Sequence, residues 1–317
     1  MGNRITASII QRTALSDVMR ARLRLAEVQE QASSGLRINR PSDDPVGYRS
    51  ASALRASIEA NDQLLRNQDR AEGRMRRADG ALGEVQNVLA RARELALQGA
   101  SGSDAQDPAT RRILAEEVAG LFDQLLAQAN TKGSEGYLFA GFASDTVPFA
   151  ASGPFGSAPP APTVAFGADP SEVEVEIDEG VRVATTLDGR ATFMGDSDGD
   201  GAPDAGREDL FDTLGDLWAA LMSNDGAATA ATLDRLDSAT TQVSAARTRL
   251  AASAQRTEAA RQAVRDRGVE FERQLSNVQD ADTVSVLSEL VSRETALQAA
   301  LQAAARLMQP SLLDFLG

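Results

Sequence analysis

The 317-residue sequence contains neither cysteine nor histidine. Without cysteine there is no disulfide, no thiolate nucleophile and no thiolate metal site, and without histidine there is no imidazole ligand or histidine base. The single lysine, Lys132, follows no glycine-rich phosphate-binding loop. We therefore expect a protein that is not an enzyme and that carries no cofactor, apart from the weak calcium site considered below.

Aromatic residues are scarce, at 4% of the chain, and no apolar run reaches eighteen residues. Because alanine and leucine dominate the apolar content, the composition favours long helices over a thick core. No segment is long enough to cross a membrane, so we expect no membrane partner. The first residues also lack the apolar segment and small-residue cleavage site of a secretory signal, and composition alone is typical of a cytoplasmic protein.

Basic residues are outnumbered, and the net charge is −14. Residues 140–209 carry 14 acidic residues against three arginines, which indicates a separate acidic unit that faces solvent. No dense basic stripe offsets this charge, so nucleic-acid binding is not expected. The arginine cluster of Arg74, Arg76 and Arg77 is interpreted as a solvated helix face.

An apolar seam runs along the last predicted helix, residues 283–308, and only Glu294 interrupts it. Spacings of three and four residues predict a narrow coiled-coil contact. The same rhythm occurs near the N-terminus, where residues 1–40 carry seven arginines against three acids. We expect the two ends to pair. The seam positions predicted to contact other subunits are Ala14, Val18, Leu25, Val28, Leu287, Leu290, Leu297, Leu301 and Met308.

A break in the helical pattern follows at Ser33–Pro45, SSGLRINRPSDDP. Glycine, asparagine and proline oppose helix continuation there, and Asp44 before Pro45 is a good helix start. The break predicts a hinge, or spoke, between the terminal helix and the next one. Its residues are Gly35, Asn39, Pro41, Asp43, Asp44 and Pro45.

Long helical patterns fill most of the remaining chain, over residues 45–98, 107–130, 209–221 and from 226 onward. The last contains apolar or threonine positions spaced by seven from Leu236 to Val278, which implies a supercoiled partner helix. Between them, residues 172–183 alternate apolar and acidic side chains around Gly180, as in a β-hairpin. The predicted fold is mainly α with a small β insert, arranged as a nested antiparallel helical hairpin or coiled coil of the N- and C-terminal regions.

This pattern divides the chain into three predicted domains. Residues 1–40 and 281–317 form a terminal coiled-coil domain, residues 41–135 and 209–280 a helical bundle, and residues 136–208 an acidic β-rich insert domain. The terminal domain has few large apolar side chains for the number of residues it must order. We therefore expect the two ends to fold fully only against other subunits.

One stretch resembles a metal site, GDSDGDGAPDAG at residues 195–206. Asp196, Asp198, Asp200 and Asp204 occupy ligand positions of a calcium-binding loop. Arg207 stands where that loop needs its bidentate glutamate, and Asp-Gly runs also form ordinary turns. The sequence thus predicts at most weak calcium binding.

The helical hairpin with SSGLRINRPSDDP resembles the flagellin superfamily, over about residues 3–150 and 210–317. Two stretches, GYLFAGFASDTVPF at residues 136–149 and SLLDFLG at residues 311–317, are similar to the superfamily members that join the flagellar hook to the filament. The resemblance implies a structural subunit of the extracellular flagellum. Such a subunit is exported unfolded through the flagellar type III channel, and its N-terminus carries the export information. The implied partners are further copies in a ring, the hook-side junction protein, flagellin and an export chaperone.

By the same resemblance, the terminal helices form an inner tube, the long helices a second domain and the insert an outward-facing one. The terminal seam residues would then make the contacts between subunits, and residues 39–44 would form an adaptable spoke. Two alternatives stay open. One is flagellin, the filament subunit, and the other is a coiled-coil scaffold in the cytoplasm.

Overall fold

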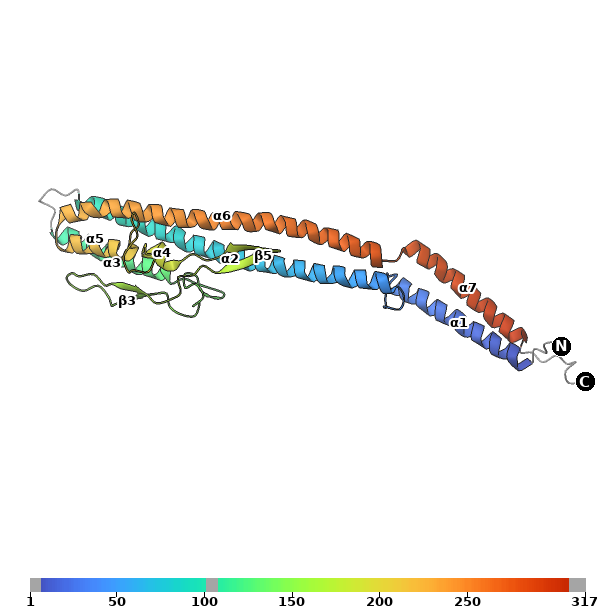
Figure 1. Ribbon diagram of the computed structural model, residues 1–317. Coiled ribbons are helices and arrows are strands. Elements are labelled where there is room, and N and C mark those ends of the chain that lie inside the picture. The colour runs from blue at the N-terminus through green and yellow to red at the C-terminus, as the bar shows by residue number, and fades with distance from the viewer. Residues whose placement is uncertain (1–6, 101–107, 308–317) are drawn as a thin grey trace, which may run out of the picture. The chain divides into compact units, whose positions relative to one another are not determined.

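The computed structural model describes residues 7–100 and 108–307, and helices dominate this part of the chain (Figure 1). The helices are α1 (Ala7–Ser34), α2 (Pro45–Ala100), α3 (Pro108–Ala129), α4 (Gly189–Phe193), α5 (Leu210–Met222), α6 (Gly226–Gln279) and α7 (Thr283–Leu307). The strands are β1 (Lys132–Gly133), β2 (Gly136–Tyr137), β3 (Phe149–Ala151), β4 (Val164–Phe166), β5 (Glu174–Asp178) and β6 (Val181–Ala184). The predicted fold class, mainly α with a small β insert, is confirmed.

The described chain divides into two compact units. The first comprises the described residues up to Asp62 together with those from Asp266 onward, and the second comprises the described part of Gln63–Arg265. Helices α2 and α6 contribute to both units. The predicted three-domain division stays a prediction, since this grouping does not decide its boundaries.

In the second unit, α2 and α6 run antiparallel. Gln86 contacts Ser244 at 2.8 Å, while Arg93 pairs with Asp237 and Arg261 with Asp69, so the numbering along the two helices runs in opposite directions. The seven-residue repeat predicted on α6 lies in this contact, and its members within the unit are buried: Leu236, Val243, Leu250, Thr257 and Val264. The partner helix that the seven-residue repeat predicted is therefore α2.

Aspartate side chains cap the N-termini of several helices. The Asp209 Oδ1 atom accepts hydrogen bonds from the backbone N–H groups of Phe211 and Asp212, at 2.8 and 3.0 Å. Asp225 caps α6 in the same way. Each cap satisfies helix N–H groups that have no partner within the helix, which explains why these helices begin where they do.

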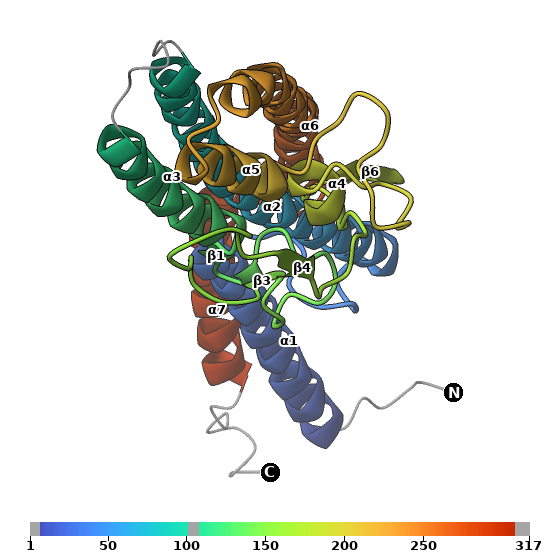
Figure 2. The same ribbon diagram turned by 90° about the vertical axis from the view of Figure 1, so that its left-hand side faces the viewer.

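An aromatic cluster lies in the core where α3 and α5 pack together. Phe122 of α3 and Phe211 of α5 lie 5.7 Å apart between ring centroids. Phe149 of β3 and Phe193 of α4 meet the Phe211 ring at 5.5 and 6.3 Å. Figure 2 shows β3 and α4 beside α3 and α5 in this unit. The insert thus buries Phe139, Phe149 and Phe193 in the core of the helices and shares that core.

The strands of the insert form three separate two-stranded antiparallel pairs, β1–β2, β3–β4 and β5–β6. The β5–β6 pair is the predicted hairpin, and Gly180 turns it with a φ of 71°, which suits glycine. The other two pairs, of two and three residues per strand, are too short to show a period-two pattern in the sequence.

Candidate functional site

The terminal helices α1 and α7 pack against each other in the first unit, as predicted. On α1, the buried or half-buried apolar positions are Ala14, Val18, Ala21, Leu25, Val28 and Ala32, the seam expected from the sequence. On α7 the inward positions are Val286, Leu290, Arg293, Leu297, Ala300 and Ala304. Only Val18, Val28 and Val286 among these are fully buried, so the pair has a thin interface.

The seam on α7 lies one residue away from part of the predicted one. Leu290 and Leu297 lie on it, whereas Leu287 and Leu301 are exposed. The reason is that Val286, Arg293 and Ala300 take the alternate heptad positions, with the aliphatic part of Arg293 standing in for an apolar side chain. Met308 lies outside the described residues.

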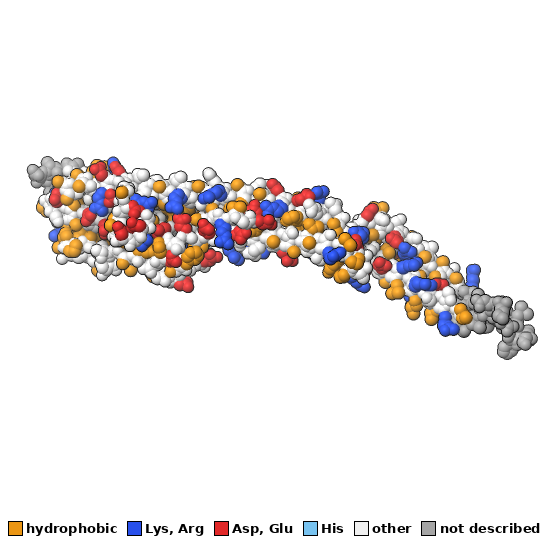
Figure 3. Space-filling view, viewed as in Figure 1, with side chains coloured by type: hydrophobic (Ala, Val, Ile, Leu, Met, Phe, Trp, Pro, Cys, Tyr) orange, Lys and Arg blue, Asp and Glu red, His pale blue; other side chains and the backbone are white. Residues whose placement is uncertain are grey.

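A second set of apolar side chains points away from the seam and is exposed. We call it the outer stripe: Leu15, Met19 and Leu23 on α1, and Val284, Leu287, Val291 and Leu301 on α7. Leu23 is 70% exposed and Val284 is 78% exposed. Figure 3 shows hydrophobic side chains, in orange, along this helix pair. Two helices with apolar side chains on a further face are suited to contact more helices.

The predicted subunit-interface residues therefore fall into two groups. Ala14, Val18, Leu25, Val28, Leu290 and Leu297 are on the inward faces of the pair within one chain. Leu287 and Leu301 are exposed and available to another chain. Sequence reasoning missed the rest of the outer stripe, although the four-residue spacing of Leu15, Met19 and Leu23 was a signal for it. Contact with other subunits through any of these residues stays a prediction.

The predicted hinge after α1 is an ordered loop. Gly35 has a φ of 73°, which ends α1, and the Asp44 Oδ1 atom accepts from the N–H groups of Val46 and Gly47 at 3.2 and 2.9 Å. Asp43 accepts from the backbone of Asn39 and Arg40. These backbone bonds lower the pKa of both aspartates. The helix start at Asp44 and Pro45 was predicted correctly, whereas the adaptable behaviour of this loop stays a prediction. The remaining hinge residue, Pro41, is exposed.

The loop lies against the second break of the chain, between α6 and α7. Leu36 and Asp280 form an isolated antiparallel β-bridge. The Arg37 N–H group donates to the Gln279 carbonyl at 2.7 Å, and the Ala281 N–H group donates to the Gly35 carbonyl at 2.9 Å. Backbone hydrogen bonds thus hold the two breaks side by side, although they are far apart in sequence.

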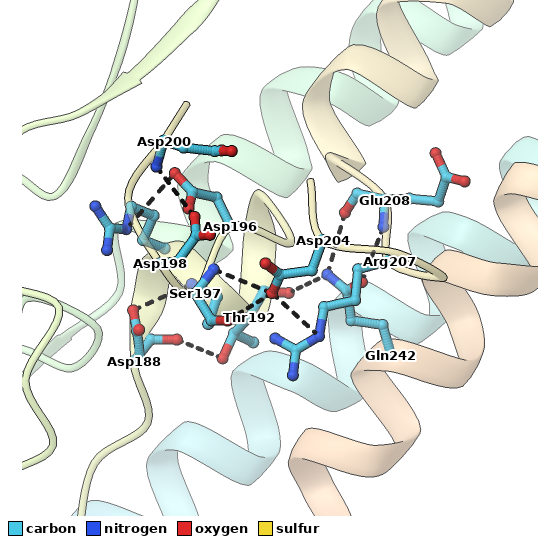
Figure 4. A network of polar contacts seen from close by, with 12 residues as sticks. Asp188, Thr192, Asp196, Ser197, Asp198, Asp200, Asp204, Arg207, Glu208 and Gln242 are labelled. Atoms are coloured by element: carbon cyan, nitrogen blue, oxygen red, sulfur yellow. Dashed lines mark hydrogen bonds and ion pairs between the residues drawn. The ribbon is translucent and has the colours of Figure 1, made fainter. Parts of the chain in front are cut away.

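The predicted calcium loop is partly assembled (Figure 4). Asp196, Asp198 and Asp200 offer ligand oxygens that all lie within 4.8 Å of one another. Asp204 lies apart from them, where its Oδ2 atom accepts from the Ser197 backbone and hydroxyl groups.

Hydrogen-bond donors of the protein already contact the Asp196 carboxylate in this loop. Asp196 accepts from the N–H groups of Gly199 and Gly201, and the Arg190 Nε atom lies 3.8 Å from its Oδ2 atom. Backbone hydrogen bonds and Arg190 outweigh burial and lower the pKa of Asp196. Because a guanidinium stands beside the carboxylates, calcium would have to compete with it. Calcium binding here stays a prediction.

Comparison with known proteins gives two matches to flagellin regions. Residues 5–144 match the N-terminal helical region of bacterial flagellin, and residues 233–316 match its C-terminal helical region. No helix in the described ranges, 7–100 and 108–307, has an apolar stretch that would cross a bilayer.

Individual relatives differ in how much of their length is matched. Flagellar hook-associated protein 3 of Escherichia coli is 28% identical over 289 residues, covering 86% of this chain and 87% of that protein. Polar flagellin F of Vibrio parahaemolyticus is 38% identical over 107 residues, covering 34% of this chain and only 28% of that flagellin. The solved structure of hook-associated protein 3 from Legionella pneumophila shares the fold, with a TM-score of 0.60 at 19% identity over 72% of this chain and 98% of that one.

Proposed function

The chain belongs to the flagellin superfamily, a family of structural proteins of the flagellum, and from this we propose that it is a structural subunit at the junction between the flagellar hook and the filament. The observation that carries the proposal is the match to a hook-associated protein 3 over 87% of that protein's length. The match to a polar flagellin covers only 28% of that protein.

The terminal helices would perform the assembly. One chain supplies a thin pair, α1 with α7, and leaves the outer stripe exposed. Burying exposed leucine and valine side chains against a second copy would contribute roughly 1.5–3 kcal/mol for each one fully buried. Where the outer stripe of one copy meets a different face of the next, repetition with a closing rotation would generate a ring.

We also propose partners for the chain in the flagellum and a route of export from the cell. The ring of this chain would lie between the hook-side junction protein and the first flagellin subunits, and an export chaperone would hold the chain before assembly. The chain would leave the cell unfolded through the flagellar type III channel and act in the extracellular flagellum. The thin α1–α7 pair supports this route, because helices that bury few side chains need little free energy to unfold.

Immunogold labelling of isolated flagella tests the location. We expect gold at one band where hook meets filament. Labelling along the whole filament, or the presence of the protein only inside cells, would contradict the proposal.

A pair of variants tests the role of the outer stripe. Leu23→Gln removes an exposed apolar side chain, and Arg24→Gln is the matched control one residue away on the exposed surface of α1. We expect Leu23→Gln to reduce the number of filaments attached to hooks, while Arg24→Gln leaves that number close to wild type. Equal effects of the two variants would show that the outer stripe does not contribute to assembly.

Flagellin itself is the second candidate, because the polar flagellin has the higher identity over its matched part. The two functions differ in copy number and in polymerisation. A filament subunit polymerises into long filaments when purified and occurs in many copies per filament. A junction subunit does neither, so electron microscopy of the concentrated, purified chain separates them.

A further inference from the structure

Three arginines of α2 converge on one small hollow in the second unit. Arg70, Arg74 and Arg77 are spaced by four and three residues and so share a face of the helix. The turn that joins β1 to β2 closes the hollow from the other side. The lining on that side consists of Gly133, Ser134, Glu135 and Gly136 of the hairpin and of Leu138, which follows β2. The enclosed space is about 10 Å³, enough for one water-sized group. We call this site the arginine hollow.

The acids of the same helix do not neutralise these arginines, because they pair elsewhere. Asp69 and Glu72 each lie within 2.8 Å of the Arg261 guanidinium on α6. Asp79 lies 2.7 Å from Arg247, also on α6. These acids occupy the face of α2 that looks toward α6.

Inside the arginine hollow the contacts are sparse. The nearest carboxylate to Arg74 is that of Glu135, at 4.0 Å, although the Arg74 side chain is only 13% exposed. The Arg77 Nη2 atom donates to the Ser134 hydroxyl at 3.1 Å. Among the residues that the structure describes, Arg70 has neither an ion pair nor a hydrogen bond. Burial lowers the pKa of Arg74, Glu135 raises it in part, and the charge of Arg77 lowers it again.

An anion would complete this arrangement. Arg74 is largely withdrawn from water, and a single carboxylate at 4.0 Å does not supply acceptors for its five N–H donors. Guanidinium groups bind phosphate, sulfate and carboxylate in a bidentate manner, with two parallel N–H···O bonds. One oxygen of such a group would fit the enclosed space, with the remaining oxygens at its mouth.

We propose that Arg70, Arg74 and Arg77 form an oxyanion-binding site, with the Ser134 hydroxyl beside them as a further polar group. The ligand class is phosphate, sulfate or carboxylate. Two sources supply this chemistry: a free anion in the surrounding solution, and an acidic side chain of a second copy of this strongly acidic chain. The site itself does not depend on the proposed junction role, and only the second source requires self-assembly.

Calorimetric titration of the full-length chain with inorganic phosphate tests the site, with sodium chloride at equal ionic strength as the reference. Arg74→Gln removes the most buried guanidinium, and Arg76→Gln is the matched control, since Arg76 pairs with Glu72 and lies outside the arginine hollow. We expect saturable binding in wild type, at least about tenfold weaker binding in Arg74→Gln, and binding within twofold of wild type in Arg76→Gln.

If Arg74→Gln does not fold, as judged by circular dichroism, the exposed Arg70→Gln variant takes its place with the same expectation. Absence of saturable phosphate binding in wild type, together with unchanged self-association in the variant, would overturn the proposal. Equal weakening in Arg74→Gln and Arg76→Gln would overturn it as well, because that result indicates general screening of charge.

Sedimentation velocity identifies the source. If a carboxylate of a second copy fills the site, Arg74→Gln weakens self-association and phosphate competes with it, while Arg76→Gln does neither. If a free anion fills the site, self-association is the same in both variants and phosphate still binds. Phosphate binding by a chain that never assembles would refute the junction role without refuting the site.

Discussion

The Arg37 Nη2 atom donates a hydrogen bond of 2.6 Å to the backbone carbonyl of Val278, 241 residues later in the chain. Arg37 follows the end of α1, and Val278 is next to the last residue of α6. The contact therefore joins the two breaks that separate the terminal helices from the long ones. Beside it lies the backbone bridge between Leu36 and Asp280, and Ile38 next to it is buried.

Replacement of Arg37 tests whether this contact holds the two breaks together. In Arg37→Ala we expect faster hydrogen exchange at the backbone amides of residue 37 and of Ala281, which donate hydrogen bonds from one break to the other. Exchange in α3 and α5 should not change. Arg40→Ala is the control, since Arg40 pairs with Glu30 on the exposed surface. If both variants exchange like wild type at Ala281, backbone bonds alone hold the breaks.

The aromatic core makes a prediction about stability. Phe211 is buried among three other rings, so Phe211→Ala should lower the free energy of unfolding of the second unit by about 3–5 kcal/mol. Phe142→Ala is the matched control, because this phenylalanine is 67% exposed, and it should cost no more than about 0.5 kcal/mol. Urea denaturation followed by the fluorescence of Trp218, whose ring lies 4.9 Å from that of Phe155, measures both. Equal losses would contradict a shared core at Phe211.

The burial of Asp209 predicts how the stability of the fold depends on pH. Burial raises its pKa to about 6, against the hydrogen bonds from Asp212 and Phe211, which lower it. Because the folded-state pKa lies above that of the unfolded chain, folding favours the protonated form. The stability from this group is complete below about pH 4 and is lost as the pH rises through about 6.

Asp209→Asn keeps a helix-capping side chain and removes the charge. We expect the free energy of unfolding of the variant to be up to about 3 kcal/mol higher than that of wild type near neutral pH, and to differ by no more than about 0.5 kcal/mol at about pH 4. Asp234→Asn, at an exposed position of α6, is the charge-matched control and should follow wild type. The same difference between Asp209→Asn and wild type at both pH values would show that Asp209 does not titrate in this window.

The aspartate loop makes a prediction about calcium. If Asp196, Asp198 and Asp200 coordinate calcium, calorimetric titration of wild type shows saturable heat and Asp198→Ala loses it. Asp145→Ala, at an exposed aspartate outside the loop, should bind like wild type. Arg190→Gln should bind more tightly, because it removes a competing cation next to Asp196. Absence of saturable heat in wild type would end the calcium hypothesis.

Periodic features of the sequence predicted the long helices well. The seven-residue repeat of α6 indicated both a helix and a partner, because a strict heptad keeps one seam toward a second helix. The start of α2 at Pro45 followed from the local chemistry of Asp44 as a cap. These features depend on residues that are near one another in sequence.

Other features that depend on distant residues were not predicted, although the pairing of the two ends was. On α7 both Leu287 and its neighbour Val286 fit an apolar stripe, and only the packing of α1 decides that Val286 is buried. The joining of Phe149 and Phe193 to the core of α3 and α5 has no periodic signal, since these rings come from loops and short elements. The backbone bridge between Leu36 and Asp280 likewise leaves no trace in residue type.

Hydrogen exchange measured by mass spectrometry, on the full-length chain as a verified monomer and again after assembly onto hooks, tests most directly whether the terminal helices are completed by other copies. We expect amides of α1 and α7 to exchange quickly in the monomer and slowly after assembly, because only three of the described side chains on the inward faces of the pair are fully buried in one chain. Amides of α3 and α5 should be protected in both states. Strong protection of α1 and α7 in the monomer, unchanged by assembly, would contradict the account.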